Sequence, residues 1–134
     1  MLRRHPYSML GCVAVAILSP ALMPASAFDD REFCVAAQQI AMAAEKDVGL
    51  WIDRVTRNAG MVVSCERKLV EFKRFTYASS ASMNEAWRER NAAEWNATHC
   101  KSPIWGDAIR NDWKIVLVVT SADGRQVTLS TRCG

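Results

Sequence analysis

The sequence has 134 residues, half of them hydrophobic, which suits one small domain with a core of its own. Its formal net charge of +3 is modest, and two of its basic residues, Arg3 and Arg4, precede an apolar run at the start of the chain. If that run is removed on export, the charge is close to neutral, so the electrostatic argument for a nucleic-acid partner is lost.

Residues 1–27 have the three parts of a secretory signal peptide: two arginines, an apolar run, and a small-x-small motif that ends at Ala27. A membrane anchor is the alternative, but the apolar core is shorter than the ~20 residues that a membrane span needs. Cleavage after residue 27 leaves residues 28–134, with 15 basic and 14 acidic residues. We therefore expect a periplasmic or secreted protein with no further membrane-spanning segment.

Export determines how the cysteines are interpreted. Loss of Cys12 with the signal peptide leaves four, Cys34, Cys65, Cys100 and Cys133. An even number in a small exported domain predicts disulfides, and four cysteines allow three connectivities. Zinc is the alternative, but zinc ligands usually come in close pairs, and here each cysteine lies more than thirty positions from the next. We expect no metal and no cofactor.

The first half of the exported chain predicts one helix and one hairpin. Asp29 or Asp30 can cap a helix whose apolar residues recur at helical spacing and which ends near Gly49. Residues 50–60 are less regular, and we expect a loop that leads into an edge strand. The segments 61–65 and 69–77 are rich in β-branched and aromatic residues and are separated by a short polar turn, so we expect two paired strands.

A second helix is predicted after a serine-rich break. Ser82 and Glu85 have the spacing of a capping box, which would start the helix at Met83 and carry it to about Ala97. Pro103 argues against an extension beyond that region. The expected apolar stripe comprises Met83, Ala86, Trp87, Ala93 and Ala97.

The C-terminal segment predicts a second hairpin around an Asp-Gly pair at 123–124. A two-residue turn would place the apolar residues of the two strands on opposite faces. A three-residue loop with a left-handed glycine shifts the register by one, so that Val119 faces Val127 and Leu117 faces Leu129. We expect the second register because it lets both strands bury one apolar face.

The order of elements is therefore helix, hairpin, helix, hairpin. The compact arrangement is an α+β fold in which two helices pack on one face of a four-stranded antiparallel sheet, in the order α-β-β-α-β-β. Cys133 has the parity of the inward residues of the last strand, and Cys100 follows the second helix. We therefore expect a Cys100–Cys133 bond, which leaves Cys34 to pair with Cys65.

Several short motifs resemble a group of small exported bacterial proteins of unassigned role. They are Ile52–Arg57 ("IDRVTR"), the strand-turn-strand after it, Cys100 behind the second helix, and the terminal hairpin with its cysteine. The similarity covers most of residues 30–133. It implies the fold and export, and little about activity. Cys34 and Cys65 look like an addition to the pattern, so the resemblance does not bear on their pairing.

Catalytic chemistry has one candidate. His99 is the only histidine after the predicted signal peptide, and a general base needs a nucleophile and an orienting partner. The sequence has neither a G-x-S-x-G nor an H-E-x-x-H motif, so we expect no catalytic residue. The alternative is a small secreted hydrolase that uses His99 with Glu94 or Asp107.

Five tryptophans are many for this length, and most should belong to the core. Trp95 lies off the predicted apolar stripe and Trp105 lies in a predicted loop, so we expect both to be exposed and to bind a partner. The leading hypothesis is a non-enzymatic exported domain that binds another protein or an envelope component, as an inhibitor or an assembly factor.

Overall fold

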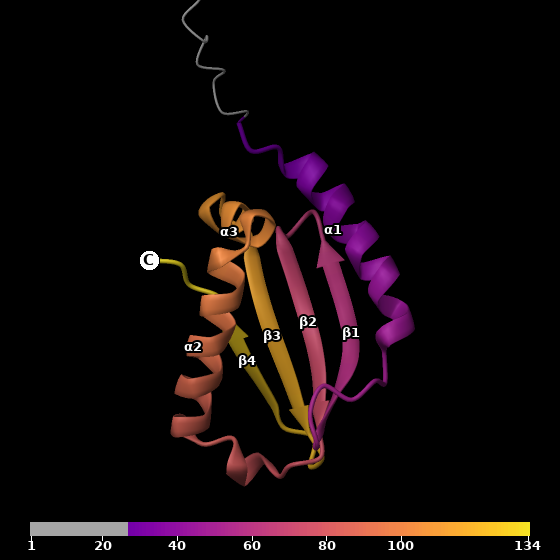
Figure 1. The fold of residues 1–134 in the computed structure, drawn as a ribbon, viewed down its shortest axis with the longest axis vertical. Helices are drawn as coiled ribbons and strands as arrows, with labels where there is room; N and C mark the ends of the chain where they lie inside the picture. The colour runs from indigo at the N-terminus through magenta and orange to yellow at the C-terminus, as the bar shows by residue number, and fades with distance from the viewer. Residues whose placement is uncertain (1–26) are drawn as a thin grey trace, which may run out of the picture.

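The computed structural model describes residues 27–134 and contains one sheet of four strands in the order β1-β2-β3-β4 (Figure 1). The predicted signal peptide lies, except for Ala27, outside the described residues. The strands are β1 (Thr56–Ser64), β2 (Leu69–Thr76), β3 (Lys114–Ser121) and β4 (Gln126–Ser130). The two predicted hairpins are both present, since β1 pairs with β2 and β3 pairs with β4 in antiparallel fashion.

The prediction of an all-antiparallel sheet is wrong, because the two central strands are parallel. Leu69 pairs with Lys114 at one end of β2 and β3, and Thr76 pairs with Ser121 at the other. The chain between them runs back along the sheet as a helix and re-enters it at the end where β2 began. Such a crossover joins parallel strands. The sheet is therefore mixed.

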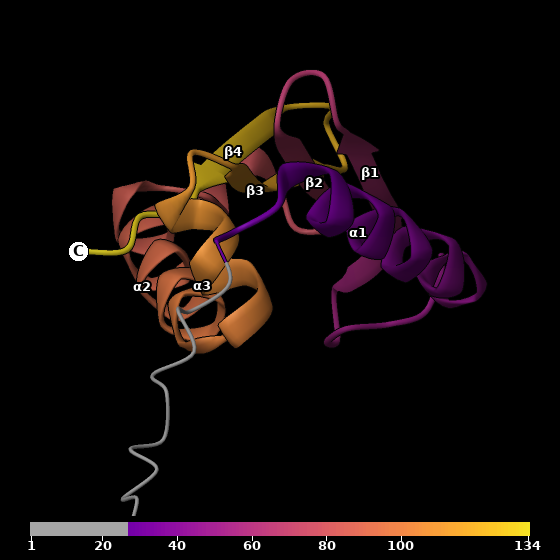
Figure 2. The same ribbon diagram turned by 90° about the horizontal axis from the view of Figure 1, so that it is seen from above.

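Helices cover one face of this sheet, as predicted, but there are three and not two. They are α1 (Asp30–Ala44), α2 (Glu85–Lys101) and α3 (Pro103–Arg110), with short 3-10 turns at Glu45–Asp47 and Ser80–Ser82. Figure 2 shows α1 beneath the β1 side of the sheet and α2 and α3 beneath the β4 side. Among the described residues, no helix has the length and apolar content needed to cross a membrane.

The third helix begins at the proline that was expected only to stop the second. Ser102 caps it by accepting a hydrogen bond from the backbone N–H of Trp105, and Pro103 occupies the first turn, where a missing N–H costs nothing. The turn between α2 and α3 is tight: a Cβ on Gly106 would lie 2.8 Å from the carbonyl oxygen of Cys100. Sequence alone showed the proline but not that the chain re-enters a helix there.

The apolar stripe predicted for α2 is also wrong. The helix starts at Glu85, with Asn84 as its cap, two residues later than expected. Of the predicted stripe, Met83 is buried but Ala86, Ala93 and Ala97 are exposed. The row that faces the sheet contains Trp87, Asn91, Trp95 and His99, at intervals of four residues. Aromatic rings bury far more area than alanines, so they decide which face turns inward.

The terminal hairpin has the expected register. Val119 pairs with Val127 and Leu117 with Leu129, and Gly124 has a positive φ of 81°. All four paired residues are buried beneath the helices. The remaining core residues come from the three helices, the other strands and the segments between them: Phe33, Cys34, Ala37, Val70, Met83, Trp95, Ala108, Trp113 and Ile115.

Two disulfides join the helices to the rest of the chain, and they are the pairs expected from the sequence. Cys34 of α1 is bonded to Cys65 at the end of β1, and Cys100 of α2 to Cys133 after β4. Each bond therefore ties one side of the helical layer to one side of the sheet.

Candidate functional site: a groove between the helices

The helical layer is divided along its length, because α1 packs on β1 whereas α3 packs on β3 and α2 on β4. Three hollows follow this division, and we call them together the inter-helix groove. The upper hollow lies between α1 and α3, the middle hollow beside α2 at Thr98 and His99, and the lower hollow beside α2 at Trp87. Their volumes are about 580, 170 and 240 Å³.

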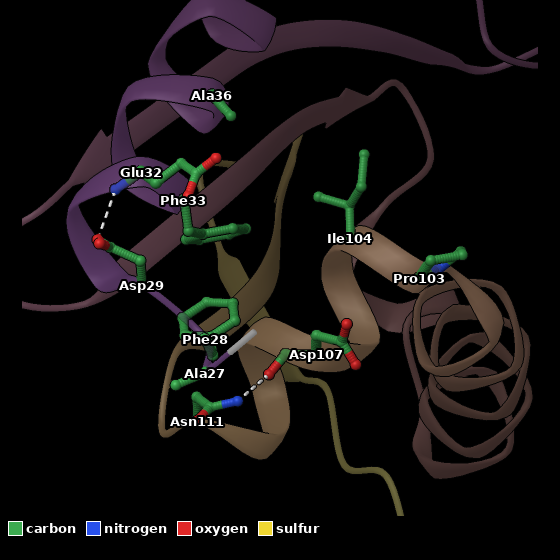
Figure 3. Close-up of a pocket in the computed structure, with 10 residues that line it drawn as sticks. All are labelled: Ala27, Phe28, Asp29, Glu32, Phe33, Ala36, Pro103, Ile104, Asp107 and Asn111. Carbon is green, nitrogen blue, oxygen red and sulfur yellow. Dashed lines mark hydrogen bonds between the residues drawn. The ribbon is translucent and has the colours of Figure 1, made fainter. Parts of the chain in front are cut away.

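The upper hollow has apolar walls and an acidic rim (Figure 3). Phe28 and Phe33 project from the α1 side, and Ile104, which is 52% exposed, projects from α3. Asp29 and Asp107 stand at its edge. Asp29 is already engaged in capping α1, since it accepts hydrogen bonds from two backbone N–H groups, and Asp107 is paired with Arg110 at 2.6 Å. The hollow is therefore an apolar recess whose rim also carries the carboxylate of Glu32.

An aromatic cluster lies between the upper and the middle hollow, since Phe33 of the upper hollow contacts Trp105, and Trp95 and His99 line the middle one. Phe72 of β2 is half-buried and makes edge-on contacts with Trp95, His99 and Trp105, with ring centroids 5.3–5.5 Å apart. Such T-shaped contacts are the favoured geometry for aromatic pairs. The sheet thus presents a partly exposed aromatic surface between the helices.

Arg74 is the next helix-facing residue of β2, and its side chain is half-buried. It lines both the middle and the lower hollow, and its guanidinium carbon lies 5.6 Å from the centre of the Trp95 ring. Burial lowers the pKa of Arg74, and the negative charge of Asp53 acts in the opposite direction. Within residues 27–134, its side chain takes part in no hydrogen bond and no ion pair. Sequence reasoning did not single out this residue.

The structure places Trp95 in the core, so its predicted exposure is wrong. The side chain is only 6% exposed, and its Nε1–H donates a hydrogen bond of 2.7 Å to Thr131 Oγ1. The error follows from the wrong apolar stripe, since Trp95 occupies the centre of the true one. Trp105 lies in α3, not in a loop, and is half-buried against Phe33 and Phe72. The partner-binding role of the two residues stays a prediction.

His99 is buried among these rings. Its ring lies 3.8 Å from that of Trp95, and its Nδ1 is 2.9 Å from the Trp95 carbonyl oxygen, which fits an Nδ1–H donor. Burial lowers the pKa of His99, the hydrogen bond to the carbonyl opposes that shift, and the charge of Arg74 adds to it. Glu94 lines the same middle hollow, whereas Asp107 belongs to the upper one.

The lower end of the groove is bordered by an apolar segment that the sequence suggested was a loop. Residues 50–52 pair with the start of β1 through backbone hydrogen bonds, and Trp51 faces Arg57. The Arg57 guanidinium lies 4.1 Å from the centre of the Trp51 ring and 5.6 Å from that of Tyr77, and the two rings are 5.5 Å apart. Because side chains alternate along an extended segment, Leu50 and Ile52 should point to the other face of the sheet, on which the helices pack. Exposed apolar residues of this segment are Leu50, Trp51, Ile52 and Val55.

In the described part of the chain, no three side chains of His, Cys, Asp and Glu gather as metal ligands would.

Comparison with known proteins finds a similarity of fold alone. No family model matches the sequence, and no curated protein matches it either. A crystal structure of a presumed secreted protein from Pseudomonas aeruginosa superposes with a TM-score of 0.63 at 12% identity, and covers 78% of this chain and 93% of that one. The pilotin EpsS of the Vibrio vulnificus type 2 secretion system gives a TM-score of 0.56 at 8% identity, covering 76% and 89%. Membership of one family with the exported bacterial proteins that the sequence resembles stays a prediction.

Proposed function

We propose that this protein is an exported, non-enzymatic assembly factor that binds a segment of a partner protein in the inter-helix groove. The observation that carries the proposal is the groove itself: hollows lined by Phe28 and Phe33 above and by Trp95 and His99 below lie in a helical layer whose helices pack on opposite sides of the sheet. A folded domain that leaves apolar surface open in a recess forgoes the free energy of burying it, and such recesses commonly receive a ligand or a partner.

The compartment is supported by the disulfides and by the structural neighbours. Two disulfides are typical of oxidising compartments outside the cytoplasm. One neighbour is described as a presumed secreted protein, and the other is a pilotin of a secretion system. Together with the predicted signal peptide, these features support export, with an envelope protein as the partner.

The shape of the groove favours a helical or extended segment as its occupant. It follows α2, which has 17 residues and is therefore about 25 Å long. An amphipathic helix of similar length could place its apolar face on Phe72, Trp105 and Ile104, as in helix-in-groove recognition. We expect the affinity to depend on a few of these aromatic contacts.

The alternative of a hydrolase has less support. Glu94 and His99 share the middle hollow, but the nearest hydroxyl group there, on Thr98, donates to the Glu94 carbonyl oxygen at 3.0 Å. The Nδ1 of His99 faces a backbone carbonyl and not a carboxylate. A general base without a nucleophile to serve has no evident reaction.

Site-specific photo-crosslinking in intact cells tests the proposal. We would place a photoreactive phenylalanine analogue at Ile104 or Thr98, which are exposed at the edge of the groove, and at Thr128, which is exposed on the opposite face of the sheet. We expect the groove positions to yield one discrete adduct with an envelope protein, identified by mass spectrometry. Thr128 is the matched control and should yield none.

Two results would contradict the proposal. Adducts of equal yield from Thr128 would show that the groove is not the contact surface. Hydrolysis of an ester or peptide substrate by the purified protein, lost in His99→Ala without unfolding, would favour the hydrolase.

A further inference from the structure

Arg74 follows two apolar residues on the helix-facing side of β2. It belongs to the helix-facing row of β2, in which Val70 is fully buried and Phe72 joins the aromatic cluster. A charged side chain in such a row must give up part of its hydration. In the free protein this cost is not recovered by pairing. The ion pairs between described residues are Lys68–Asp30 and Arg110–Asp107, and neither involves Arg74.

Two carboxylates lie near Arg74 without pairing with it. Asp53 lines the lower hollow and Glu94 the middle one, yet neither is within 4 Å of the guanidinium. Asp53 Oδ1 instead accepts a hydrogen bond of 2.8 Å from the backbone N–H of Val55, which shapes the turn before β1. The N–H donors of Arg74 therefore remain open toward the groove.

Resting on the function proposed above, we propose that Arg74 is the specificity residue of the inter-helix groove and binds an Asp or Glu side chain of the partner segment. A guanidinium offers a planar pair of donors that matches the two oxygens of a carboxylate. The Trp95 ring at 5.6 Å and the half-buried setting exclude much of the competing water, which strengthens such a contact.

The surrounding hollows indicate a side chain and not a chain terminus. Arg74 stands where the middle and lower hollows meet, and each hollow extends away from it along α2, the middle one to Thr98 and the lower one to Trp87. A bound chain can therefore continue in both directions past the guanidinium. Asn91 also lines both hollows at Arg74, and its Nδ2 already donates a hydrogen bond of 2.8 Å to the Trp87 carbonyl oxygen.

Three capped tripeptides test the assignment by NMR titration of the folded protein. The probes are acetyl-Leu-Glu-Leu-amide, its neutral isostere acetyl-Leu-Gln-Leu-amide, and acetyl-Leu-Gln-Leu with a free terminal carboxylate. We expect the Glu peptide to shift the Arg74 Nε–H and Trp95 indole signals and to bind at least fivefold more tightly than the Gln amide. Arg74→Gln should abolish this difference. Arg67→Gln, in the exposed turn between β1 and β2, is the matched control and should retain it.

Each other result overturns the assignment. Equal or absent responses to the Glu and Gln amides would leave no carboxylate site, and tightest binding of the free-acid peptide would point to a chain terminus. Equal displacement by inorganic phosphate would indicate a general anion site. None of these peptide results changes the crosslinking result, so the proposed partner binding in the groove can hold even if the assignment of Arg74 fails. Conversely, a preference for the Glu peptide without any crosslinked adduct from the groove positions would refute the proposed function but support a carboxylate site at Arg74.

Thermal unfolding of the free protein separates recognition from a structural role. If Arg74 serves a ligand, Arg74→Met should unfold at the same temperature as the wild type or at a higher one, because it removes a half-buried charge that has no ion pair among the described residues and only the Trp95 ring, 5.6 Å away, beside it. A clear fall in the unfolding temperature of Arg74→Met would show that the guanidinium supports the fold and would overturn the inference.

Discussion

The two walls of the groove are built differently. On the α2–α3 side, packing against the core follows α2 along its length: Met83, just before the helix, is buried, Trp87 is half-buried, and Trp95 and His99 are buried. The buried residues of α1 are confined to its first half, Phe33, Cys34 and Ala37, and Met42 near its end is 71% exposed. One wall is therefore fixed by packing, whereas the other is fixed at one end.

The anchored end of α1 relies on specific bonds. Its disulfide joins Cys34 to Cys65, and Asp30 accepts a hydrogen bond of 2.8 Å from Trp113 Nε1 and pairs with Lys68 at 2.7 Å. Local stability in a protein follows the density of buried apolar contacts, so the far end of α1 should open more readily than α2. A groove with one firm wall and one lightly held wall can adapt to its occupant.

The largest effect should come from the firm wall. Trp95→Ala removes a buried indole and leaves Thr131 without its donor, so we expect a loss of about 3–5 kcal/mol in the free energy of unfolding. Urea denaturation followed by circular dichroism measures it. Met42→Ala, on the exposed part of α1, is the control and should change stability by less than about 0.5 kcal/mol. A small effect of Trp95→Ala would mean that Trp95 is not core.

Removal of each disulfide should sharpen the contrast between the walls. The bonds span 31 and 33 residues, so the chain-entropy estimate gives each a similar contribution of about 3.5–4 kcal/mol. The location of the damage should differ. In Cys34→Ala/Cys65→Ala, the amides of α1 should exchange hydrogen well before those of the sheet. In Cys100→Ala/Cys133→Ala, the protection of α1 should be unchanged.

Hydrogen-exchange mass spectrometry distinguishes these outcomes. If α1 stays as protected as the sheet without its disulfide, packing holds that wall as firmly as the other, and the comparison fails.

The smallest effect is a pH dependence that belongs to the firm wall. The pKa of His99 is lowered chiefly by burial, so the unfolded chain binds a proton more readily than the folded one. The free energy of unfolding should therefore fall as the pH drops below the ordinary histidine value of 6.5, until the folded-state pKa is passed. His99→Gln should remove this slope between pH 7 and 5.

In His99→Gln, a second fall in the free energy of unfolding should remain at lower pH. The pKa values of Asp30 and Asp123 are lowered from 3.8 by hydrogen bonds, to Lys68 and to Ser121 respectively, so their contribution is lost only at lower pH. An unchanged slope between pH 7 and 5 in the variant would show that His99 is not the titrating group.

Local features of the fold could be predicted because they depend on neighbouring residues. The start of α1, the two hairpins and the register of β3 with β4 follow from capping groups, alternation and the requirement that one face be apolar. The disulfide pairs followed from the same parity, since Cys133 had to face the helical layer.

The candidate site could be predicted only in part. His99 and Trp105 were singled out by type, and both lie at the groove, but Arg74 was not, because nothing local distinguishes it from a solvent-facing arginine. The exposed segment around Leu50 was interpreted as a loop, although it pairs with β1. Whether a side chain borders a recess depends on elements that are far apart in the sequence.

The sequence by itself determined the α+β class, the two hairpins and the residues available for covalent cross-links. Only the tertiary structure decided that β2 and β3 are parallel, that Pro103 begins a helix, and that α2 turns Trp95 inward. The physical reason is that alternation within a strand predicts which of its faces is buried. It does not predict which strand pairs with it, or whether that pair is parallel or antiparallel. The groove exists because α1 packs near one edge of that sheet and α2 near the other. No local sequence pattern predicts the distance between these two helices.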